Sequence, residues 1–165
     1  MVAEFLKTGQ AELAVAASLG DTWDRLDNWP LFTERFELIA NSEHRFATRD
    51  TITFSELSPE RLLIRAHCEH FEPLASLLRS QELDVDRAHE VSSEHDLAAF
   101  IESGVGVSFA PRSASTLSSF MRAAVHGFDL KRTVFLYGVA GRERTPVANM
   151  MLKMLRSADW SRFAN

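Results

Sequence analysis

The sequence predicts an α/β fold, in which short strands and helices alternate along the chain. Short apolar runs recur over the 165 residues, and several are followed by segments whose apolar residues fall at helical spacing. Glycine, proline and small polar residues separate these segments. Hydrophobic residues make up 45% of the chain, which is the usual share for a globular domain. Strands that alternate with helices favour parallel βαβ units.

In the first half of the chain, apolar runs predict short strands over residues 11–17, 36–40 and 61–65. The strand over residues 11–17 is expected to be buried. A short helix over residues 3–8 precedes it and ends at Gly9, because glycine readily takes the left-handed conformation that closes a helix.

The next segments repeat the alternation of helix and strand. Leu74, Leu77 and Leu78 fall at helical spacing, and proline is tolerated in the first turn of such a helix. A strand over residues 87–91 follows. A helix over residues 94–103 is then predicted, with a serine as its N-cap and a glycine at its end.

The last segments are strands over residues 105–110 and 133–139 and a final helix. Thr145 caps this helix, and Pro146 takes its first position. We expect its apolar stripe to face the core. The alternative is a partner-binding surface, since flexible thioethers suit adaptable contacts. The stripe consists of Val147, Met150, Met151, Met154 and Leu155.

Charge and composition limit the classes of function. The net charge is -5 and the basic residues are scattered, whereas a duplex-binding surface needs clustered cations. We therefore expect no direct contact with nucleic acid. No apolar run is long enough to span a bilayer, and residues 1–10 do not resemble a signal peptide, so we expect a cytoplasmic protein without membrane contact. Cys68 is the only cysteine, which excludes an intrachain disulfide.

The predicted ligand site follows from the strand order. Parallel sheets bind ligands at the carboxyl ends of strands, near helix N-termini. A guanidinium and the following helix start would suit an anionic ligand, and serine hydroxyls would add hydrogen bonds. An N-cap, a turn residue or a solvated strand end are the competing interpretations of these positions. The predicted ligand-binding residues are Ser18, Leu19, Arg65, His67, Ser92 and Ser93.

Metal binding and catalysis are competing interpretations of the same segments. His67, Cys68 and His70 lie near a second polar cluster at residues 94–96, but the spacing matches no strong zinc signature. Nothing orients Cys68 as a nucleophile, and contiguous residues cannot form a Ser–His–Asp triad. We therefore expect no catalytic residue, no metal site and no cofactor.

The order of motifs resembles the effector-binding (substrate-binding) domain of LysR-type transcriptional regulators. A segment with Gly before Leu-Ala, a crossover strand followed by His and Ala, a Gly-hydrophobic-Gly motif that ends in Pro, and a return strand with a closing helix occur in the family's order. These matches lie at residues 5–16, 30–47, 52–57, 101–111, 132–142 and 157–160.

The resemblance implies a two-lobed, periplasmic-binding-protein-like (type 2) fold with a small-molecule effector bound in the cleft. Lobe one would combine residues 1–33 and 129–165, and lobe two would contain residues 34–128. The resemblance also implies a sensor that is not an enzyme, that takes a small anionic effector, and that works as a homo-oligomer, the family's members being dimers.

The chain departs from the family at its beginning. The DNA-binding winged helix-turn-helix, the linker helix and the first strand-helix-strand of the effector domain have no counterpart in these residues, so lobe one is expected to be N-terminally truncated. Its first strand would then have an open edge, and exposed apolar edges recruit partners. A shortened gene, a truncated or proteolysed piece, and segment exchange with a second copy all remain open.

Two alternatives to the sensor follow. The first is an interaction module that pairs with itself or with a full-length regulator through the open edge of lobe one. The second is a metal or small-molecule carrier related to bilobal solute-binding proteins, and the lack of a signal peptide argues against its exported form.

Overall fold

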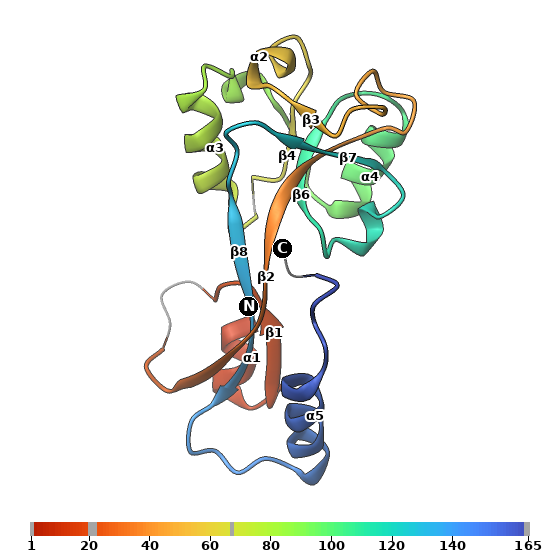
Figure 1. Ribbon diagram of the computed structural model, residues 1–165. Coiled ribbons are helices and arrows are strands. Elements are labelled where there is room, and N and C mark those ends of the chain that lie inside the picture. Colours follow the sequence, from red (N-terminus) through yellow and green to blue (C-terminus); the bar gives the residue numbers. More distant parts are fainter. Residues whose placement is uncertain (1, 20–22, 67, 164–165) are drawn as a thin grey trace. The chain divides into compact units, whose positions relative to one another are not determined.

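The computed structural model describes residues 2–19, 23–66 and 68–163, and the chain divides into two compact units (Figure 1). Unit 1 comprises Met1–Glu34 and Lys131–Asn165, and unit 2 comprises Arg35–Leu130. The long strand β2 (Leu26–Ala40) has residues in both units.

Unit 1 contains a small sheet in which β1 (Leu13–Ala16) and β2 flank β8 (Lys131–Val139). β1 runs antiparallel to β8, with Leu13 opposite Gly138 and Ala16 opposite Phe135. Helix α1 (Val2–Thr8) contacts both strands, and its Leu6 is buried with residues of β8. The sheet and α1 therefore share one small apolar cluster.

Helix α1 ends as the sequence predicts. Gly9 has a φ of 79°, which is the left-handed conformation expected at a helix end. The Arg142 guanidinium then donates to the carbonyl oxygens of Leu6 (2.6 Å) and Lys7 (3.0 Å). A cation at this position satisfies unpaired carbonyl groups and interacts favourably with the helix dipole.

Helix α5 (Pro146–Ser157) begins where predicted, but its apolar stripe does not face the core. The Thr145 hydroxyl accepts a hydrogen bond from the Ala148 backbone N–H at 3.2 Å, and Ala148 is the buried residue of the helix. Leu155 is half-buried. The prediction of a core stripe is wrong for the other members, which are 47–67% exposed: Val147, Met150, Met151 and Met154.

Unit 2 is a mixed sheet with helices on both sides. β6 (Ser108–Pro111) and β7 (Met121–Val125) each pair antiparallel with β2, and β3 (Thr51–Ile52) pairs parallel with β7. β4 (Leu63–Ile64) and β5 (His89–Glu90) form a parallel pair, and a parallel bridge joins Leu62 to Val107 just before β6.

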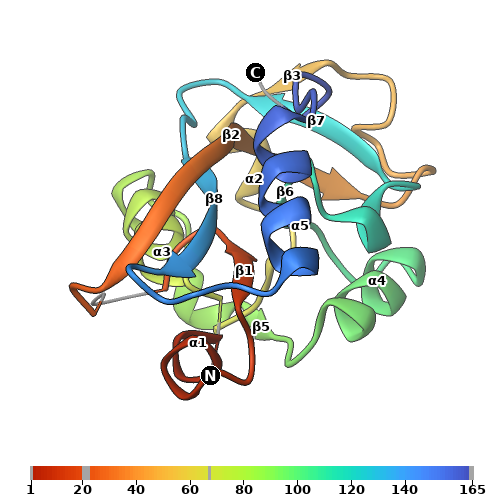
Figure 2. The ribbon, with the colours of Figure 1, turned by 90° about the horizontal axis from the view of Figure 1, so that it is seen from below.

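Helices α3 (Phe71–Ser80) and α4 (Glu94–Glu102) cover opposite faces of the β4 region, as Figures 1 and 2 show. Side chains alternate across a strand, so Ile64 packs with the cluster that contains α3, and Leu63 packs with the cluster that contains α4. The remaining short elements of the unit are α2 (Phe54–Leu57) and the 3-10 helices η1 (Val85–Arg87) and η2 (Ser115–Leu117).

Several predicted strands differ in extent from the observed ones. The strand predicted over residues 61–65 is shortened to β4, and that over residues 87–91 is shortened to β5. The strand expected over residues 11–17 is not buried throughout, since Val15 is 52% exposed. Parallel pairing is confirmed for β4 with β5 and is also found for β3 with β7, whereas β1 with β8, β6 with β2 and β7 with β2 pair antiparallel.

Candidate functional site

Three of the predicted ligand-binding residues come together at one edge of unit 2. Arg65 follows β4, and Ser92 and Ser93 follow β5. Because these two strands are adjacent and parallel, their carboxyl ends lie at the same edge. The start of α4 adds Glu94 and Asp96, and we call these five residues the β4–β5 edge site.

The Arg65 guanidinium is already engaged by an acid of this site. Its Nη1 lies 3.4 Å from Oε2 of Glu94, and the two side chains are 24% and 32% exposed. Glu94 is the first residue of α4, where the helix dipole favours a carboxylate. The pair is long and partly solvated, and a guanidinium has five N–H donors, so further donors of Arg65 are available to an acceptor.

Both serines of the site donate to Asp96. The Asp96 carboxylate accepts from the Ser93 hydroxyl at 2.7 Å and from the Ser92 hydroxyl at 3.1 Å. Ser93 also caps α4, because its hydroxyl oxygen accepts from the Asp96 backbone N–H at 3.1 Å. The hydrogen bond from Ser93, and then that from Ser92, lowers the pKa of Asp96 below its ordinary value. Asp96 therefore stays ionised at neutral pH and holds both hydroxyls.

This arrangement is better suited to binding and orienting a ligand than to activating a serine as a nucleophile. The serine hydroxyls donate to a carboxylate and not to a histidine, which is the arrangement of a helix cap and differs from that of an activated nucleophile. In the described parts of the chain, no group of three His, Cys, Asp or Glu side chains is arranged to hold a metal ion. The same parts contain no helix that is long and apolar enough to cross a bilayer.

A small pocket lies beside Arg65. Its volume is about 20 Å³, so side chains fill most of the space. The rings of Phe36 and His70, which line it, have their centroids 5.3 Å apart. A ligand larger than a water molecule would have to displace some of these side chains. The lining consists of Phe36, Ile64, Arg65, Cys68, His70, Phe71, Leu74, Ser108 and Phe109.

Sequence reasoning missed several residues of this lining. Phe36 and Phe109 were interpreted only as strand residues, although β2 and β6 pair beside each other and bring both rings to the pocket. Ser108 was also missed; it is buried, and its hydroxyl donates to the Leu63 carbonyl oxygen at 2.7 Å. A polar residue inside an apolar strand was the available signal.

The other predicted site residues lie elsewhere. Ser18 is exposed, and Leu19 is half-buried against the apolar cluster of unit 1; both follow β1. His67 lies outside the described residues. Ser18, Leu19 and Arg65 thus follow strands, as predicted. Their contact with a ligand remains a prediction.

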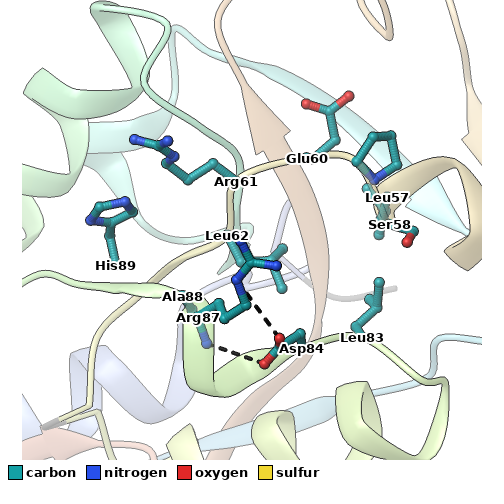
Figure 3. Close-up of a pocket in the computed structure, with 11 residues that line it drawn as sticks. Leu57, Ser58, Glu60, Arg61, Leu62, Leu83, Asp84, Arg87, Ala88 and His89 are labelled. Carbon is teal, nitrogen blue, oxygen red and sulfur yellow. Dashed lines mark hydrogen bonds and ion pairs between the residues drawn. The ribbon is translucent and has the colours of Figure 1, made fainter.

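A larger pocket, of about 480 Å³, lies at the opposite end of the β4–β5 pair (Figure 3). Its lining includes Arg61 and Leu62, which precede β4, and His89, which begins β5. No residue of this pocket was predicted from the sequence, because the prediction considered only the carboxyl ends of strands.

Solved structures with the same fold are regulatory domains and regulators. The regulatory domain of CcmR from Synechocystis, in complex with 2-PG, matches with a TM-score of 0.74 and 18% identity over 94% of this chain and 77% of that one. The effector-binding domain of QuiR, in complex with shikimate, matches with a TM-score of 0.74 and 14% identity over 93% and 74%. The comparison with curated proteins gave no match.

HinK, a LysR family transcriptional regulator from Pseudomonas aeruginosa, matches with a TM-score of 0.76 and 16% identity. The match covers 98% of this chain but 56% of that one. These likenesses establish a fold of the periplasmic-binding-protein type 2 class. The family model of the LysR substrate binding domain matches residues 1–160, and the chain therefore belongs to the family of LysR substrate-binding domains.

Proposed function

We propose that the chain is the effector-sensing part of a LysR-type transcriptional regulator and that it binds a small anionic molecule through the β4–β5 edge site. In this proposal it acts in the cytoplasm, catalyses no reaction and makes no direct contact with DNA. The observation that carries the proposal is Arg65, which stands at the carboxyl end of β4 beside the start of α4 and forms a long ion pair with Glu94.

The chemistry of the site supports an anion. A guanidinium offers forked donors to a carboxylate, and the first N–H groups of a helix have no partner within the helix. Glu94 would then compete with the ligand for Arg65. The relatives solved with 2-PG and with shikimate are consistent with a small effector, and shikimate is an organic carboxylate. Binding would favour the conformation that holds the ligand best, which is how an effector biases a regulator.

A thermal-shift screen against small organic acids tests the proposal. A ligand at about 100 times its Kd adds roughly 2.7 kcal/mol of stability. We expect Arg65→Met to weaken binding of the hit by about tenfold, because a charge-assisted hydrogen bond is lost. We expect Glu94→Gln to strengthen binding, because it removes the competing carboxylate.

The matched control is Arg79→Met, which removes an exposed arginine that pairs with Asp86 at 3.2 Å; neither residue belongs to the β4–β5 edge site. It should leave the affinity of the hit unchanged. A flat screen on folded protein, or a hit that binds Arg65→Met as tightly as the parent chain, would refute the proposed site.

The second candidate function is an interaction module that pairs with a second copy of the chain. Among the described residues β1 pairs only with β8, and its Val15 is 52% exposed. The four exposed residues of α5 fall at positions i, i+3, i+4 and i+7, so they form one apolar face. An open strand edge and an exposed apolar face in the same unit both favour association.

Light scattering and sedimentation over a range of concentrations test this second function. We expect self-association that Met150→Glu weakens by about tenfold or more, because a charge would be placed in an apolar contact. Lys153→Glu changes charge on the same exposed helix outside the apolar face and should have little effect. A clean monomer at high concentration would contradict self-pairing.

A further inference from the structure

We infer that the pocket at the amino ends of β4 and β5 is a second ligand site, for a small organic carboxylate. This inference is independent of the β4–β5 edge site, which lies at the carboxyl ends of the same strands. The pocket has a volume of about 480 Å³, which is within the range of small-molecule sites.

The backbone places two basic side chains on one side of this pocket. The Arg61 carbonyl oxygen accepts from the Val107 N–H at 2.9 Å, and the His89 N–H donates to the Leu62 carbonyl oxygen at 2.8 Å. Arg61 lies two residues before Leu63, and His89 lies two residues before Val91; Leu63 and Val91 both pack in the α4 cluster. Period-two alternation therefore puts Arg61 and His89 on the same face of the strand pair.

These two side chains are unengaged. Over residues 2–19, 23–66 and 68–163, the structure gives the side chains of Arg61 and His89 no hydrogen bond and no ion pair, and Figure 3 shows both lining the pocket. Both residues are exposed. Close packing also fixes the position of Arg61, since a Cβ added at Gly106 would lie 2.2 Å from the Arg61 carbonyl oxygen.

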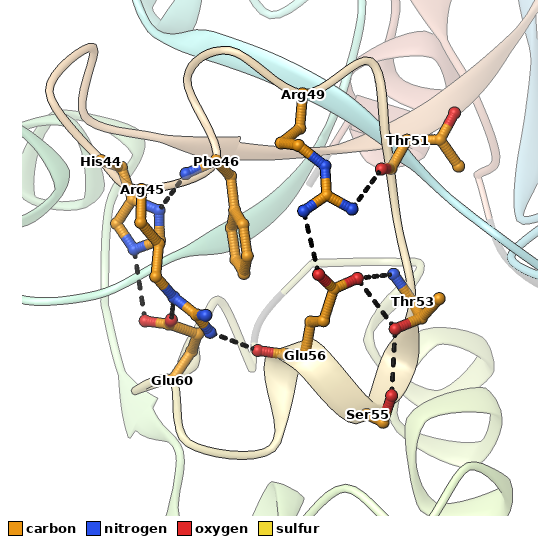
Figure 4. Close-up of polar contacts among 9 residues, drawn as sticks. All are labelled: His44, Arg45, Phe46, Arg49, Thr51, Thr53, Ser55, Glu56 and Glu60. Carbon is orange, nitrogen blue, oxygen red and sulfur yellow. Dashed lines mark hydrogen bonds and ion pairs between the residues drawn. The ribbon is translucent and has the colours of Figure 1, made fainter.

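The acidic side chains of the lining are already paired. The Glu60 carboxylate accepts from Arg45 Nε at 2.6 Å and from His44 Nε2 at 3.2 Å, neither of which lines the pocket (Figure 4). Asp84 accepts from the Arg87 backbone N–H at 3.2 Å and lies 3.9 Å from its Nε. The charge of Arg61 is therefore not compensated locally, and the pocket favours an anion.

The leucines of the lining belong to the core of unit 2. Leu57, Leu62 and Leu83 are buried at 0%, 6% and 5% exposure and pack in the cluster that contains α3, so the apolar lining residues with solvent-exposed surface are Pro59 and Ala88. The neighbouring Glu56 fixes the entry of α2, because its carboxylate accepts from the backbone N–H of Thr53 at 2.8 Å (Figure 4). An unpaired guanidinium in a mostly polar pocket suits a small carboxylate, whose two oxygens match its forked donors.

Titration of the full chain with hexanoate, followed by amide NMR shifts, tests the inference. We expect saturable shifts at Leu62, Leu83 and His89, and much smaller shifts with hexan-1-ol, which lacks the charge. Arg61→Met should raise the Kd of hexanoate by about tenfold, which corresponds to one charge-assisted hydrogen bond. His89→Gln, which retains a donor, should have a smaller effect.

Two control variants make the outcome specific. Lys153→Met removes one exposed positive charge from α5 and should bind hexanoate unchanged. Arg65→Met should also leave these shifts unchanged, so the test is separate from that of the β4–β5 edge site. Shifts of equal size with hexan-1-ol, shifts that persist in Arg61→Met, or shifts found only near Arg65 and Ser92 would each overturn the inference.

Discussion

Glu34 is a fully buried charged residue that forms an ion pair with Arg132. The Glu34 side chain has 0% exposure, and its Oε1 accepts from Arg132 Nε at 2.8 Å. The pair joins β2 to β8 within unit 1, next to a hydrogen bond of 2.8 Å between the hydroxyls of Thr33 and Thr133. Since a buried carboxylate is costly without a partner, removal of the guanidinium should cost far more than loss of a surface pair.

We predict that Arg132→Met lowers the free energy of unfolding by about 3 kcal/mol, measured by urea denaturation. The control is Arg35→Met, because Arg35 pairs with Asp129 at 3.7 Å while both side chains are more than half exposed. That pair should contribute less than about 1 kcal/mol. The double variant Glu34→Gln, Arg132→Met should recover part of the loss. Equal effects of the two arginine substitutions would contradict a special role for the buried pair.

At the scale of elements, local signals in the sequence predict helices well. For α4, the serine cap, the apolar residues Leu97 and Ile101, and the glycine at its end all follow from rules that act within a few residues. The full length of β2 was missed because Pro30 and polar residues interrupt its pattern. β7 was missed because its pairing with β2 depends on residues distant in sequence.

The candidate site likewise combines features that local sequence predicts with features that depend on residues distant in the sequence. Strand ends and helix starts are local, so the positions of Arg65, Ser92 and Ser93 could be predicted. The ion pair of Arg65 with Glu94 depends on how β4 and α4 meet in space, and the pocket near Arg61 depends on the amino ends of strands, which no local pattern marks. The exposed stripe of α5 has the same periodicity as a buried one, and periodicity does not say what covers it.

At Gly106, the packing of the backbone leaves no room for a side chain. A Cβ there would meet the Arg61 carbonyl oxygen at 2.2 Å, where the segment before β6 bonds to the segment before β4. We predict that Gly106→Ala destabilises unit 2 by about 2 kcal/mol, measured by urea denaturation, because overpacking forces the strands apart.

The control for this prediction is Gly104→Asn, two positions earlier. A Cβ at Gly104 meets nothing within 4 Å, and its φ of 69° is one that asparagine tolerates. This variant should lose less than about 1 kcal/mol. A stable Gly106→Ala variant would mean that β4 and β6 are less closely held than their hydrogen bonds indicate.

At the scale of the molecule, the two units differ in how much apolar surface they bury. Unit 2 contains two clusters, one on each side of β4, that draw on α3 and α4. In unit 1, the apolar cluster that contains α1 has Leu6, Tyr137 and Val139 as its buried members. Helix α5 exposes most of its apolar side chains to solvent. Since burial of apolar surface is the main source of stability, unit 1 should open more often.

We predict that the amide hydrogens of Leu136 and Val139 exchange with solvent at least about tenfold faster than those of Leu63 and Ile39. Hydrogen exchange in a dilute solution of the protein measures this difference. If a second copy covers the apolar face of α5, protection of unit 1 should rise with protein concentration while that of unit 2 stays constant. Met150→Glu should abolish this concentration dependence, because it places a charge on that face. Equal protection of both units in dilute solution would show that they unfold as one cooperative unit, and the smaller core of unit 1 would then have no separate consequence for stability.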